Sequence, residues 1–305
     1  YLHHIVSLSA GDGYVLALDM WGNVWIWGNR ANVVPGTTQS LPYRMDFSKS
    51  FYDVDRDYAT PDTSDEDNVV IAAISAGYDH ALALDSTGHV WAWGNNGFGQ
   101  LGNDAASYTN TSGGITTKWT WSIPYNQTEP GYSPTISAQS SSTVEGEIIP
   151  VHVIRGSAAS EDYHYLDHVV DIAAGRYFSV ILRSDGTVWA WGRNNFYQLG
   201  QHQFTAGNPT TAGRADTLDR YAAVQVKGVG GAGKLTNIVD VAAGTNHAVA
   251  LDSDGKAYIW GRITYTSSGT VSTYSAPTAV TGADMPALKR LSSSYETVLA
   301  VGVDG

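Results

Sequence analysis

The chain has 305 residues, a formal net charge of −12, 33 glycines, 10 tryptophans and no cysteine. A surface of this sign repels phosphate backbones and anionic membranes, so the composition argues against nucleic acid as a partner. The lack of cysteine excludes a disulfide scaffold and thiol catalysis, and because no apolar run reaches the roughly eighteen residues of a membrane span, we expect no membrane insertion.

The first unit of the chain pairs a short apolar run with a run that contains tryptophan. The run IVSLSAG ends at Gly11, and the run NVWIWGN carries Gly28, 17 residues later. A second apolar run lies between them, and a fourth follows at residues 41–47. Short runs separated by turns that end in glycine predict four antiparallel strands joined by hairpins.

The same unit returns three times further along the chain. Its two glycines are again 17 residues apart in the pairs Gly77 and Gly94, Gly175 and Gly192, Gly244 and Gly261. The first glycines of successive units are 66, 98 and 69 residues apart. The spacing within a unit is constant, whereas the spacing between units varies. This combination predicts a rigid repeated unit that tolerates insertions between its copies. We divide the single domain, residues 1–305, into repeats at about 5–47, 69–154, 168–227 and 238–281, a partial repeat at 288–305, and insertions at about 29–67 and 103–147.

Large and small residues alternate within the tryptophan runs. VWAWG places Trp91 and Trp93 on one face of a strand and valine and alanine on the other, because successive side chains of a strand alternate. Trp189 and Trp191 repeat this arrangement. In the last full unit, Trp260 stands directly before the glycine, at the position of Trp93 and Trp191. The small residues of AAG suit an innermost strand, where neighbouring blades of a ring converge. We therefore predict an all-β fold, a β-propeller of four-stranded antiparallel blades with the tryptophans packed between blades.

The order of these motifs resembles the repeat of the regulator of chromosome condensation family, whose members form β-propellers, typically of seven blades. The resemblance is clear at residues 76–102, 169–200 and 238–261, weaker at 5–28, and degraded at 288–305, where SSS replaces AAG. The chain thus shows four full repeats and part of a fifth. We expect protein partners to complete it, either further repeats of the same polypeptide or other copies of the chain in a homo-oligomer or filament.

An acidic stretch at residues 53–67 is a candidate calcium site. Its alternating carboxylates, Asp53, Asp55, Asp57, Asp62 and Asp65, supply the oxygen ligands that calcium prefers. A helix-loop-helix calcium loop would need a glycine and a glutamate at two positions where this stretch has neither. A solvated acidic loop is the alternative interpretation, and we expect no other cofactor.

The 103–147 insertion is rich in hydroxyl and aromatic side chains, among them Trp119, Trp121 and Tyr125. Such loops on a rigid scaffold make adaptable recognition surfaces. Alternatively, TKWTWSI forms an extra hairpin that packs on the edge of a blade. His80 and His247 occupy the same place in two repeats, and we interpret both as structural side chains that hydrogen-bond to the turn backbone.

No residue pattern in the sequence predicts catalysis. We expect a non-enzymatic protein-binding or assembly module, outside a bacterial cell or on its surface, that uses its open ends or rim loops. The alternatives are a secreted enzyme inhibitor, since one bacterial β-lactamase inhibitor resembles this repeat pattern, and a glycan-binding surface module. A guanine-nucleotide exchange factor on chromatin, the role of the family's name-giving members, is opposed by the acidic composition and the lack of a basic tail. Asn110 and Asn126 are sequons that matter only in a host that glycosylates asparagine.

Overall fold

The computed structural model describes residues 2–30, 33–35, 39–47, 69–103, 105–112, 115–122, 150–155, 165–201, 217–265, 270–282 and 285–304. Blade 1 contains β1 (Ile5–Ala10), β2 (Tyr14–Asp19), β3 (Val24–Gly28) and β4 (Gln39–Arg44). Blade 2 contains β5 (Ile71–Ala76), β6 (His80–Asp85), β7 (Val90–Gly94) and β10 (Val151–His152). Blade 3 contains β11 (Val169–Ala174), β12 (Phe178–Arg183), β13 (Val188–Gly192) and β14 (Arg220–Gln225). Blade 4 contains β15 (Ile238–Ala243), β16 (His247–Asp252), β17 (Ala257–Tyr265) and β18 (Thr270–Ala279).

Two further pairs of strands complete the described elements. Blade 5 consists of β19 (Leu288–Ser294) and β20 (Thr297–Gly302), and a separate hairpin of β8 (Ala105–Ser112) and β9 (Ile115–Ser122) lies in the 103–147 insertion. One short 3-10 turn, η2 (Val229–Gly231), follows blade 3. The predicted fold class is confirmed: antiparallel blades, four of them with four strands and a fifth with two.

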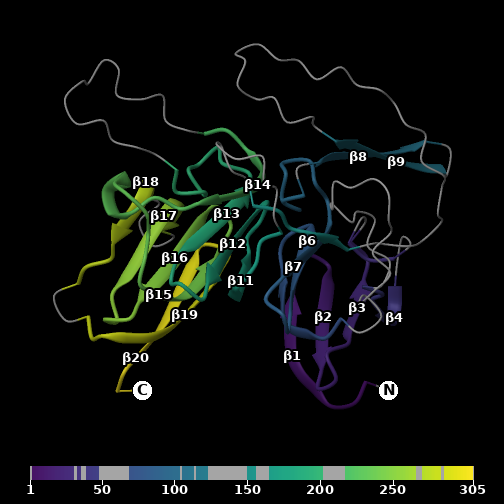
Figure 1. The fold of residues 1–305 in the computed structure, drawn as a ribbon, viewed down its shortest axis with the longest axis horizontal. Helices are drawn as coiled ribbons and strands as arrows, with labels where there is room; N and C mark the ends of the chain where they lie inside the picture. The colour runs from purple at the N-terminus through teal and green to yellow at the C-terminus, as the bar shows by residue number, and fades with distance from the viewer. Residues whose placement is uncertain are drawn as a thin grey trace, which may run out of the picture.

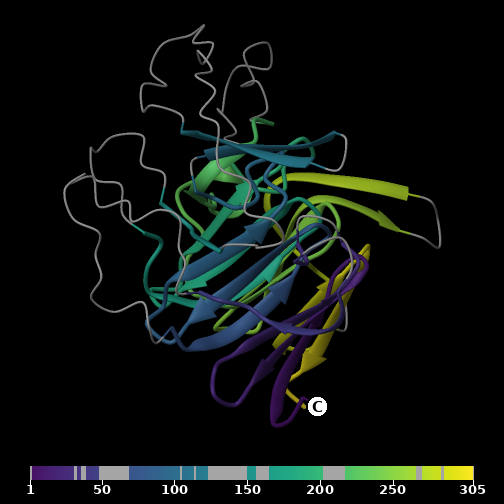
Figure 2. The same cartoon turned by 90° about the vertical axis from the view of Figure 1, so that its right-hand side faces the viewer.

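The blades follow one another in chain order around a common centre, with blades 1 and 5 at the two ends of an arc (Figure 1). Turning the molecule by 90° brings the purple blade 1 and the yellow blade 5 to the same side of the picture (Figure 2). The β8–β9 hairpin lies above the blades in both views. The described part of the chain contains no helix that is long and apolar enough to cross a membrane.

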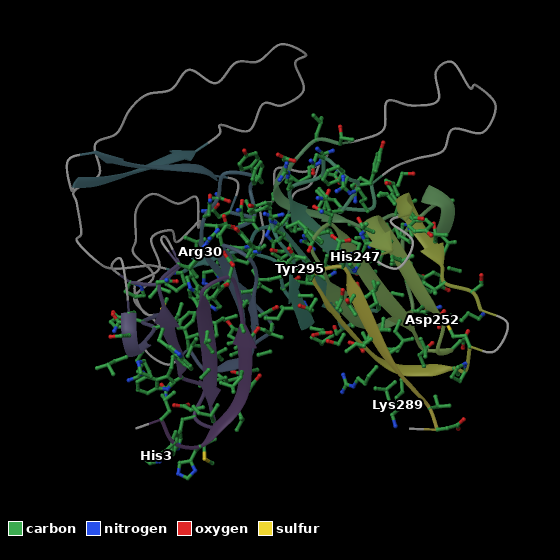
Figure 3. All side chains as sticks on the ribbon, turned by 180° about the vertical axis from the view of Figure 1, so that it is seen from behind. His3, Arg30, His247, Asp252, Lys289 and Tyr295 are labelled. Carbon is green, nitrogen blue, oxygen red and sulfur yellow. The ribbon has the colours of Figure 1, made fainter. Side chains whose placement is uncertain are left out.

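The alternation of strand directions gives the arc two faces. The loop face carries the turn between the first and second strands of each blade and the connection between the third and fourth. The opposite face, which we call the turn face, carries the turn between the second and third strands. Arg30 and Tyr295 lie on the loop face, whereas His3 and Lys289 lie on the turn face (Figure 3).

The core lies between the blades, where tryptophans of one blade pack on small residues of the preceding blade. Trp191 of blade 3 packs with Val90 and Ala92 of blade 2, in line with the alternation in the sequence. Trp260 makes the same contact with blade 3, and Trp91 and Trp93 pack on blade 1. Each interface thus buries large apolar surfaces, which is the main stabilising contribution to stacked repeats.

The inner-strand glycine of each complete blade lies under a ring three residues further on. The pairs are Gly11 with Tyr14, Gly77 with His80, Gly175 with Phe178, and Gly244 with His247. A Cβ on any of these glycines would collide with the ring of its own blade. Blade 5 has Ser294 and Thr297 at these positions, so the loss of the glycine accompanies the loss of the ring.

Side chains of the inner strands join each blade to the next. The bonds run from Ala76 N–H to Ser9 Oγ (2.9 Å), from Ala174 N–H to Ser75 Oγ (2.9 Å), from Val241 N–H to Asp171 Oδ2 (3.3 Å) and from Leu291 N–H to Asp240 Oδ2 (2.7 Å). In every case the acceptor belongs to the earlier blade and the backbone donor to the later one. These contacts fix the register between blades in the small space where large side chains would collide.

An aspartate at the end of the second strand holds the turn that follows it. Asp85 accepts hydrogen bonds from the backbone N–H of Thr87 and of His89, at 2.9 and 3.0 Å, and from Trp91 Nε1 at 2.9 Å. Burial works to raise the pKa of Asp85, but these bonds and the Thr87 hydroxyl outweigh it and hold the pKa below its ordinary value. Asp19 and Asp252 hold the equivalent turns of blades 1 and 4.

Replacing Asp85 with alanine is therefore expected to lower the free energy of unfolding by about 2 kcal/mol, because the buried Trp91 Nε1 and the partly buried donors of Thr87 and His89 lose a charged acceptor. Urea denaturation of the purified chain measures the change. The neighbouring exposed Ser86→Ala is the control and should change stability by less than about 0.5 kcal/mol. Equal stability of the two variants would show that the aspartate does not hold the turn.

Candidate functional site

The loop face of blades 1 to 3 carries a continuous series of arginine and aromatic side chains. We call it the arginine–aromatic row and define it as Arg30, Tyr78, Phe98, Arg176, Tyr177 and Arg193. These residues follow either the inner-strand glycine or the glycine at the end of the third strand. They therefore come from separate connections that the propeller brings side by side.

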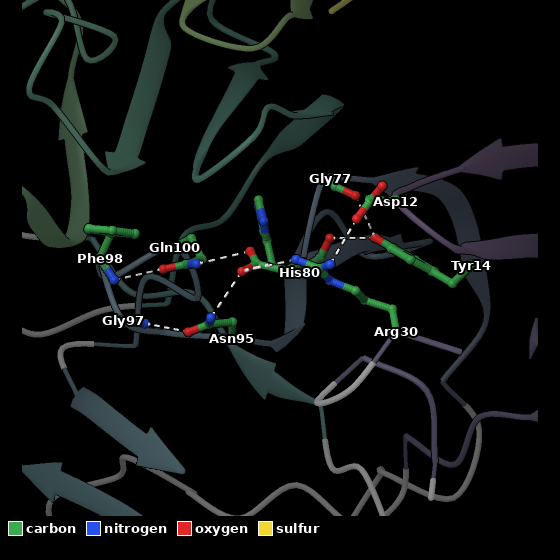
Figure 4. A network of polar contacts seen from close by, with 10 residues as sticks. Asp12, Tyr14, Arg30, Gly77, His80, Asn95, Gly97, Phe98 and Gln100 are labelled. Atoms are coloured by element: carbon green, nitrogen blue, oxygen red, sulfur yellow. Dashed lines mark hydrogen bonds and ion pairs between the residues drawn. The ribbon is translucent and has the colours of Figure 1, made fainter. Parts of the chain in front are cut away.

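Arg30 forms the blade 1 end of the row. Its Nη1 lies 2.8 Å from Asp12 Oδ2 (Figure 4). Its guanidinium carbon lies 4.2 Å from the centroid of the Tyr78 ring. A second carboxylate, Asp79 Oδ2, lies 3.9 Å from Arg30 Nη2. The guanidinium is thus held at one edge by carboxylates and on one face by a ring, which is the arrangement that arginine favours.

Asp79 lies beneath the row and ties its connections together. It accepts hydrogen bonds from Asn95 Nδ2 at 2.9 Å and from Gln100 Nε2 at 3.3 Å (Figure 4). Burial raises the pKa of Asp79, although Gln100 and Arg30 oppose the shift. This network fixes the connection that carries Phe98, since Gln100 Oε1 in turn accepts the Phe98 N–H at 2.9 Å.

Arg176 lies between two tyrosines at the middle of the row. Its guanidinium carbon is 4.7 Å from the centroid of Tyr78 and 5.1 Å from that of Tyr177. The two rings meet edge to face, with centroids 5.4 Å apart. Burial works against the charge, but Tyr177 and Tyr78 outweigh it and raise the pKa of Arg176. Arg176 is therefore a fixed positive charge at neutral pH.

Arg193 closes the row on blade 3. It lies 4.5 Å from the Phe98 centroid and 5.4 Å from the Tyr177 centroid, and these two rings are 5.2 Å apart. Arg262 of blade 4 repeats the contact over Phe196 at 4.0 Å. Among the described residues, Arg176, Arg193 and Arg262 have no carboxylate within ion-pair distance. The loop face thus presents stacked, positively charged groups on a chain whose net charge is −12.

The chemistry of the row suits binding. Tyrosine and arginine are enriched among the residues that dominate protein interfaces, and stacked side chains lose little rotamer entropy when a partner docks. The described part of the chain has no cluster of three or more metal-ligating side chains. His80 and His247, the most buried titratable rings, have their pKa lowered by burial to about 3 and about 4, so both are neutral at pH 7.

The two histidines differ from the sequence expectation in their partners. His80 Nε2 lies 2.9 Å from Ser179 Oγ, and His247 Nε2 lies 2.9 Å from Ser293 Oγ. Both partners belong to the next blade, so the rings join blades and the expected bond to the turn backbone was wrong. Their position over the inner-strand glycine explains this, because it directs the ring edge outward from its own blade.

The structure places the predicted binding residues only in part. Trp119 and Trp121 lie in β9 of the extra hairpin, opposite Tyr108 and Ala106 of β8. Tyr125 and the proposed calcium ligands, Asp53, Asp55, Asp57, Asp62 and Asp65, lie outside the described residues.

Sequence reasoning missed the arginine–aromatic row altogether. Its blade 1 and blade 2 members do not recur at one position of the repeat: the two residues after the inner-strand glycine are Tyr-Asp in blade 2 and Arg-Tyr in blade 3. A signal was available in the other connection, because Arg193 and Arg262 each directly follow the third-strand glycine, and Phe98 and Phe196 each lie four residues after it.

Comparison with known proteins shows what the repeats are similar to. Residues 71–100, 169–198 and 238–265 match a family model described as "Regulator of chromosome condensation (RCC1) repeat", and residues 185–251 match a second model with that description. The chain is 28% identical over 260 residues to Protein pim1 of Schizosaccharomyces pombe. The matched residues make up 85% of this chain and 37% of pim1. It is 24% identical over 306 residues to Regulator of chromosome condensation of Xenopus laevis. This match covers 99% of this chain and 57% of that protein.

Among solved structures, human WBSCR16 superposes with a TM-score of 0.60 at 17% sequence identity, covering 99% of this chain and 60% of that one. This likeness concerns the fold. The chain spans between about a third and three fifths of the length of the two curated relatives.

Proposed function

We propose that this chain, whose repeats match the regulator of chromosome condensation repeat, is a non-enzymatic protein-binding module, and that its partner docks on the arginine–aromatic row. The observation that carries the proposal is the unbroken contact series from Arg30 to Arg193 across three blades. Rigid propeller blades hold these side chains in place before binding, so the partner meets a preformed surface.

Charge and ring chemistry together define the expected partner surface. The guanidinium groups of Arg176 and Arg193, which have no carboxylate of the described residues within ion-pair distance, favour carboxylates of a partner. The tyrosine and phenylalanine rings between them favour apolar or aromatic side chains. A partner with both, on a segment long enough to cross three blades, would use the whole row.

The test compares variants of the row with a control on the turn face. The purified chain captures its partner from cells of the source organism by cross-linking, and the identified partner is then purified and titrated by calorimetry. Tyr78→Ala and Arg193→Ala are each expected to weaken binding at least about tenfold, the usual loss at a dominant interface residue. Met20→Ala/Trp21→Ala, exposed on the turn face, should change affinity less than about twofold. Unchanged affinity in both row variants would overturn the proposal.

The extracellular or cell-surface bacterial location is part of the same proposal. It rests on the acidic composition and on the degenerate repeats with their long insertions. Fractionation of source cells, with the chain detected by antibody in the medium or at the surface, checks it; recovery from the cytosol alone would refute it.

A further inference from the structure

The contact between Arg193 and Phe98 recurs one blade later on the loop face. The Arg193 guanidinium carbon lies 4.5 Å from the centroid of the Phe98 ring. The Arg262 guanidinium carbon lies 4.0 Å from the centroid of the Phe196 ring. In both contacts the arginine directly follows the third-strand glycine of one blade, and the phenylalanine belongs to the preceding blade. We call these two contacts the junction pairs, because one spans the junction of blades 2 and 3 and the other spans that of blades 3 and 4.

The same backbone bonds hold both arginines. The Arg193 N–H donates to Tyr177 O at 2.9 Å, and the Arg262 N–H donates to Asn246 O at 2.7 Å. Tyr177 and Asn246 occupy the same place in their blades, two residues after the inner-strand glycine. Both arginines are half-buried, so part of each side chain is open to solvent.

The two phenylalanines are also held alike, each by a glutamine two residues further along the chain. Gln100 Oε1 accepts the Phe98 N–H at 2.9 Å. Gln198 Oε1 accepts the Phe196 N–H at 2.8 Å. Both glutamines are buried. A buried scaffold of one form therefore holds both junction pairs in place before a partner docks.

Both guanidinium groups are available to carboxylates of a partner. Among the described residues, neither Arg193 nor Arg262 has a carboxylate within ion-pair distance. Burial raises the pKa of Asp219, and Arg193 is among the groups that oppose this shift, but the Asp219 carboxylate accepts the Asn194 N–H at 2.8 Å. An arginine stacked on a ring keeps its N–H groups in the guanidinium plane, where they suit bidentate bonds to a carboxylate.

The junction of blades 1 and 2 has no such pair among the described residues. Asn95 stands where blades 3 and 4 have an arginine, and its Nδ2 donates to Asp79 Oδ2 at 2.9 Å. Arg30, the arginine beside this junction, forms an ion pair with Asp12 at 2.8 Å, and the Asp12 side chain is 49% exposed. The loop face thus changes from an exposed carboxylate on blade 1 to arginines that pair with no described carboxylate on blades 3 and 4.

We propose that the two junction pairs are equivalent carboxylate subsites, and that the partner of the loop face is a protein segment with a run of aspartate or glutamate residues. The run lies over blades 3 and 4, because Asp12 repels it from blade 1. This inference rests on the proposed function for the choice of face, and it adds Arg262 and the chemistry and direction of the segment. The net charge of −12 repels a long polyanion such as nucleic acid, whereas a short acidic run meets mainly the local arginines.

The first measurement needs no variant. We expect a fluorescein-labelled peptide of eight glutamates to bind the whole chain saturably in anisotropy titrations, and a peptide of eight glutamines to bind at least about tenfold more weakly. An oligothymidylate of twelve nucleotides should also bind more weakly than octaglutamate. Equal binding of the two peptides, no binding of octaglutamate at about 1 mM, or tighter binding of the oligothymidylate would overturn the proposal.

Variants then test whether the two subsites are equivalent. Arg193→Gln and Arg262→Gln should each weaken octaglutamate binding about fivefold, and the double variant should weaken it about 25-fold, since separate subsites contribute independently. Lys256→Gln removes the same charge from an exposed turn of the turn face and should change affinity less than about twofold. Asp12→Asn should strengthen binding about twofold, because it removes the repelling carboxylate. A loss confined to one arginine, or weaker binding by Asp12→Asn, would contradict the proposal.

This inference and the proposed function can fail separately. If Tyr78→Ala weakens binding of the purified partner but octaglutamate does not bind, the acidic chemistry is wrong and the docking site stands. If octaglutamate binds through both Arg193 and Arg262 but the partner binds Tyr78→Ala and Arg193→Ala with unchanged affinity, the subsites stand and the row is not the docking site.

Discussion

Replacing Gly192 with alanine is expected to lower the free energy of unfolding by about 4 kcal/mol, a loss at the upper end of single substitutions. Gly192 ends the third strand of blade 3 with φ +96°, a conformation that residues with a side chain rarely adopt. A Cβ there would lie 2.6 Å from the Tyr177 carbonyl oxygen and 2.7 Å from Phe178 Cα. Both are backbone atoms, so the strand itself would have to move, and with it the connections that carry Tyr177 and Arg193.

Gly230 provides the matched control for this prediction. Its φ is +67°, also left-handed, but nothing lies within 4 Å of an added Cβ. Gly230→Ala should therefore cost only the conformational penalty, about 1 kcal/mol. Urea denaturation followed by tryptophan fluorescence measures both variants. If the two lose equal stability, the close approach of the neighbouring strand has no part in the requirement for glycine.

Acid is expected to destabilise the chain through His80, and replacing His80 with phenylalanine should remove that effect. Burial lowers the pKa of His80 to about 3 in the folded chain, against about 6.5 when unfolded. The unfolded chain therefore binds the proton first. The stability that His80 contributes is complete above pH of about 6.5 and is lost as pH falls towards about 3, at up to about 1.4 kcal/mol per pH unit.

Phenylalanine is the suitable replacement because blade 3 already has Phe178 at the same register position, opposite Gly192 as His80 is opposite Gly94. Ser179 Oγ, which loses its contact with His80, keeps the Gln100 carbonyl at 3.3 Å. Thermal unfolding at a series of pH values from 7 to 4 should show a shallower loss of stability in His80→Phe. The same slope in both chains would contradict a buried neutral histidine.

Asp171 should have the opposite effect on how stability depends on pH. It therefore serves as a control for the direction of the His80 effect. Burial, with the neighbouring Asp240 adding to it, raises the pKa of Asp171 to about 6. The folded chain then binds the proton first, and lowering the pH through about 6 towards about 4 stabilises it. Asp171→Asn keeps an acceptor for the Val241 N–H. It should make the loss of stability with falling pH steeper, whereas His80→Phe should make that loss shallower.

The repeats could be predicted from the sequence because their glycines and tryptophans have strict steric roles. The constant spacing of Gly175 and Gly192 reflects two fixed contacts within one blade, with the Phe178 ring and with the Tyr177 backbone. Spacing within a unit is local, so it can be read from one chain. The four-stranded blades and the packing of Trp191 on Ala92 followed from it.

The arginine–aromatic row could not be predicted in this way. Arg30 meets Tyr78, and Tyr177 meets Phe98, only because separate blades converge on the loop face. These two contacts join residues that lie far apart in the sequence and occupy different positions of the repeat, so no period reveals them. The contact of Arg193 with Phe98 does follow the period, because Arg262 and Phe196 repeat it one blade later. The change from glycine to Ser294 in blade 5 was likewise interpreted as degradation, whereas it accompanies the replacement of the ring by Thr297.

The bonds between inner strands have one direction, and this bears on how the chain folds during synthesis. Each acceptor, such as Ser75 or Asp240, belongs to the blade that leaves the ribosome first, and the N–H that it binds belongs to the blade that follows. A finished blade therefore presents side-chain oxygens to a backbone that has not yet folded. Because repeats of this kind gain stability mainly from contact with a formed neighbour, nucleation on the N-terminal blade and growth towards the C-terminus need no later rearrangement.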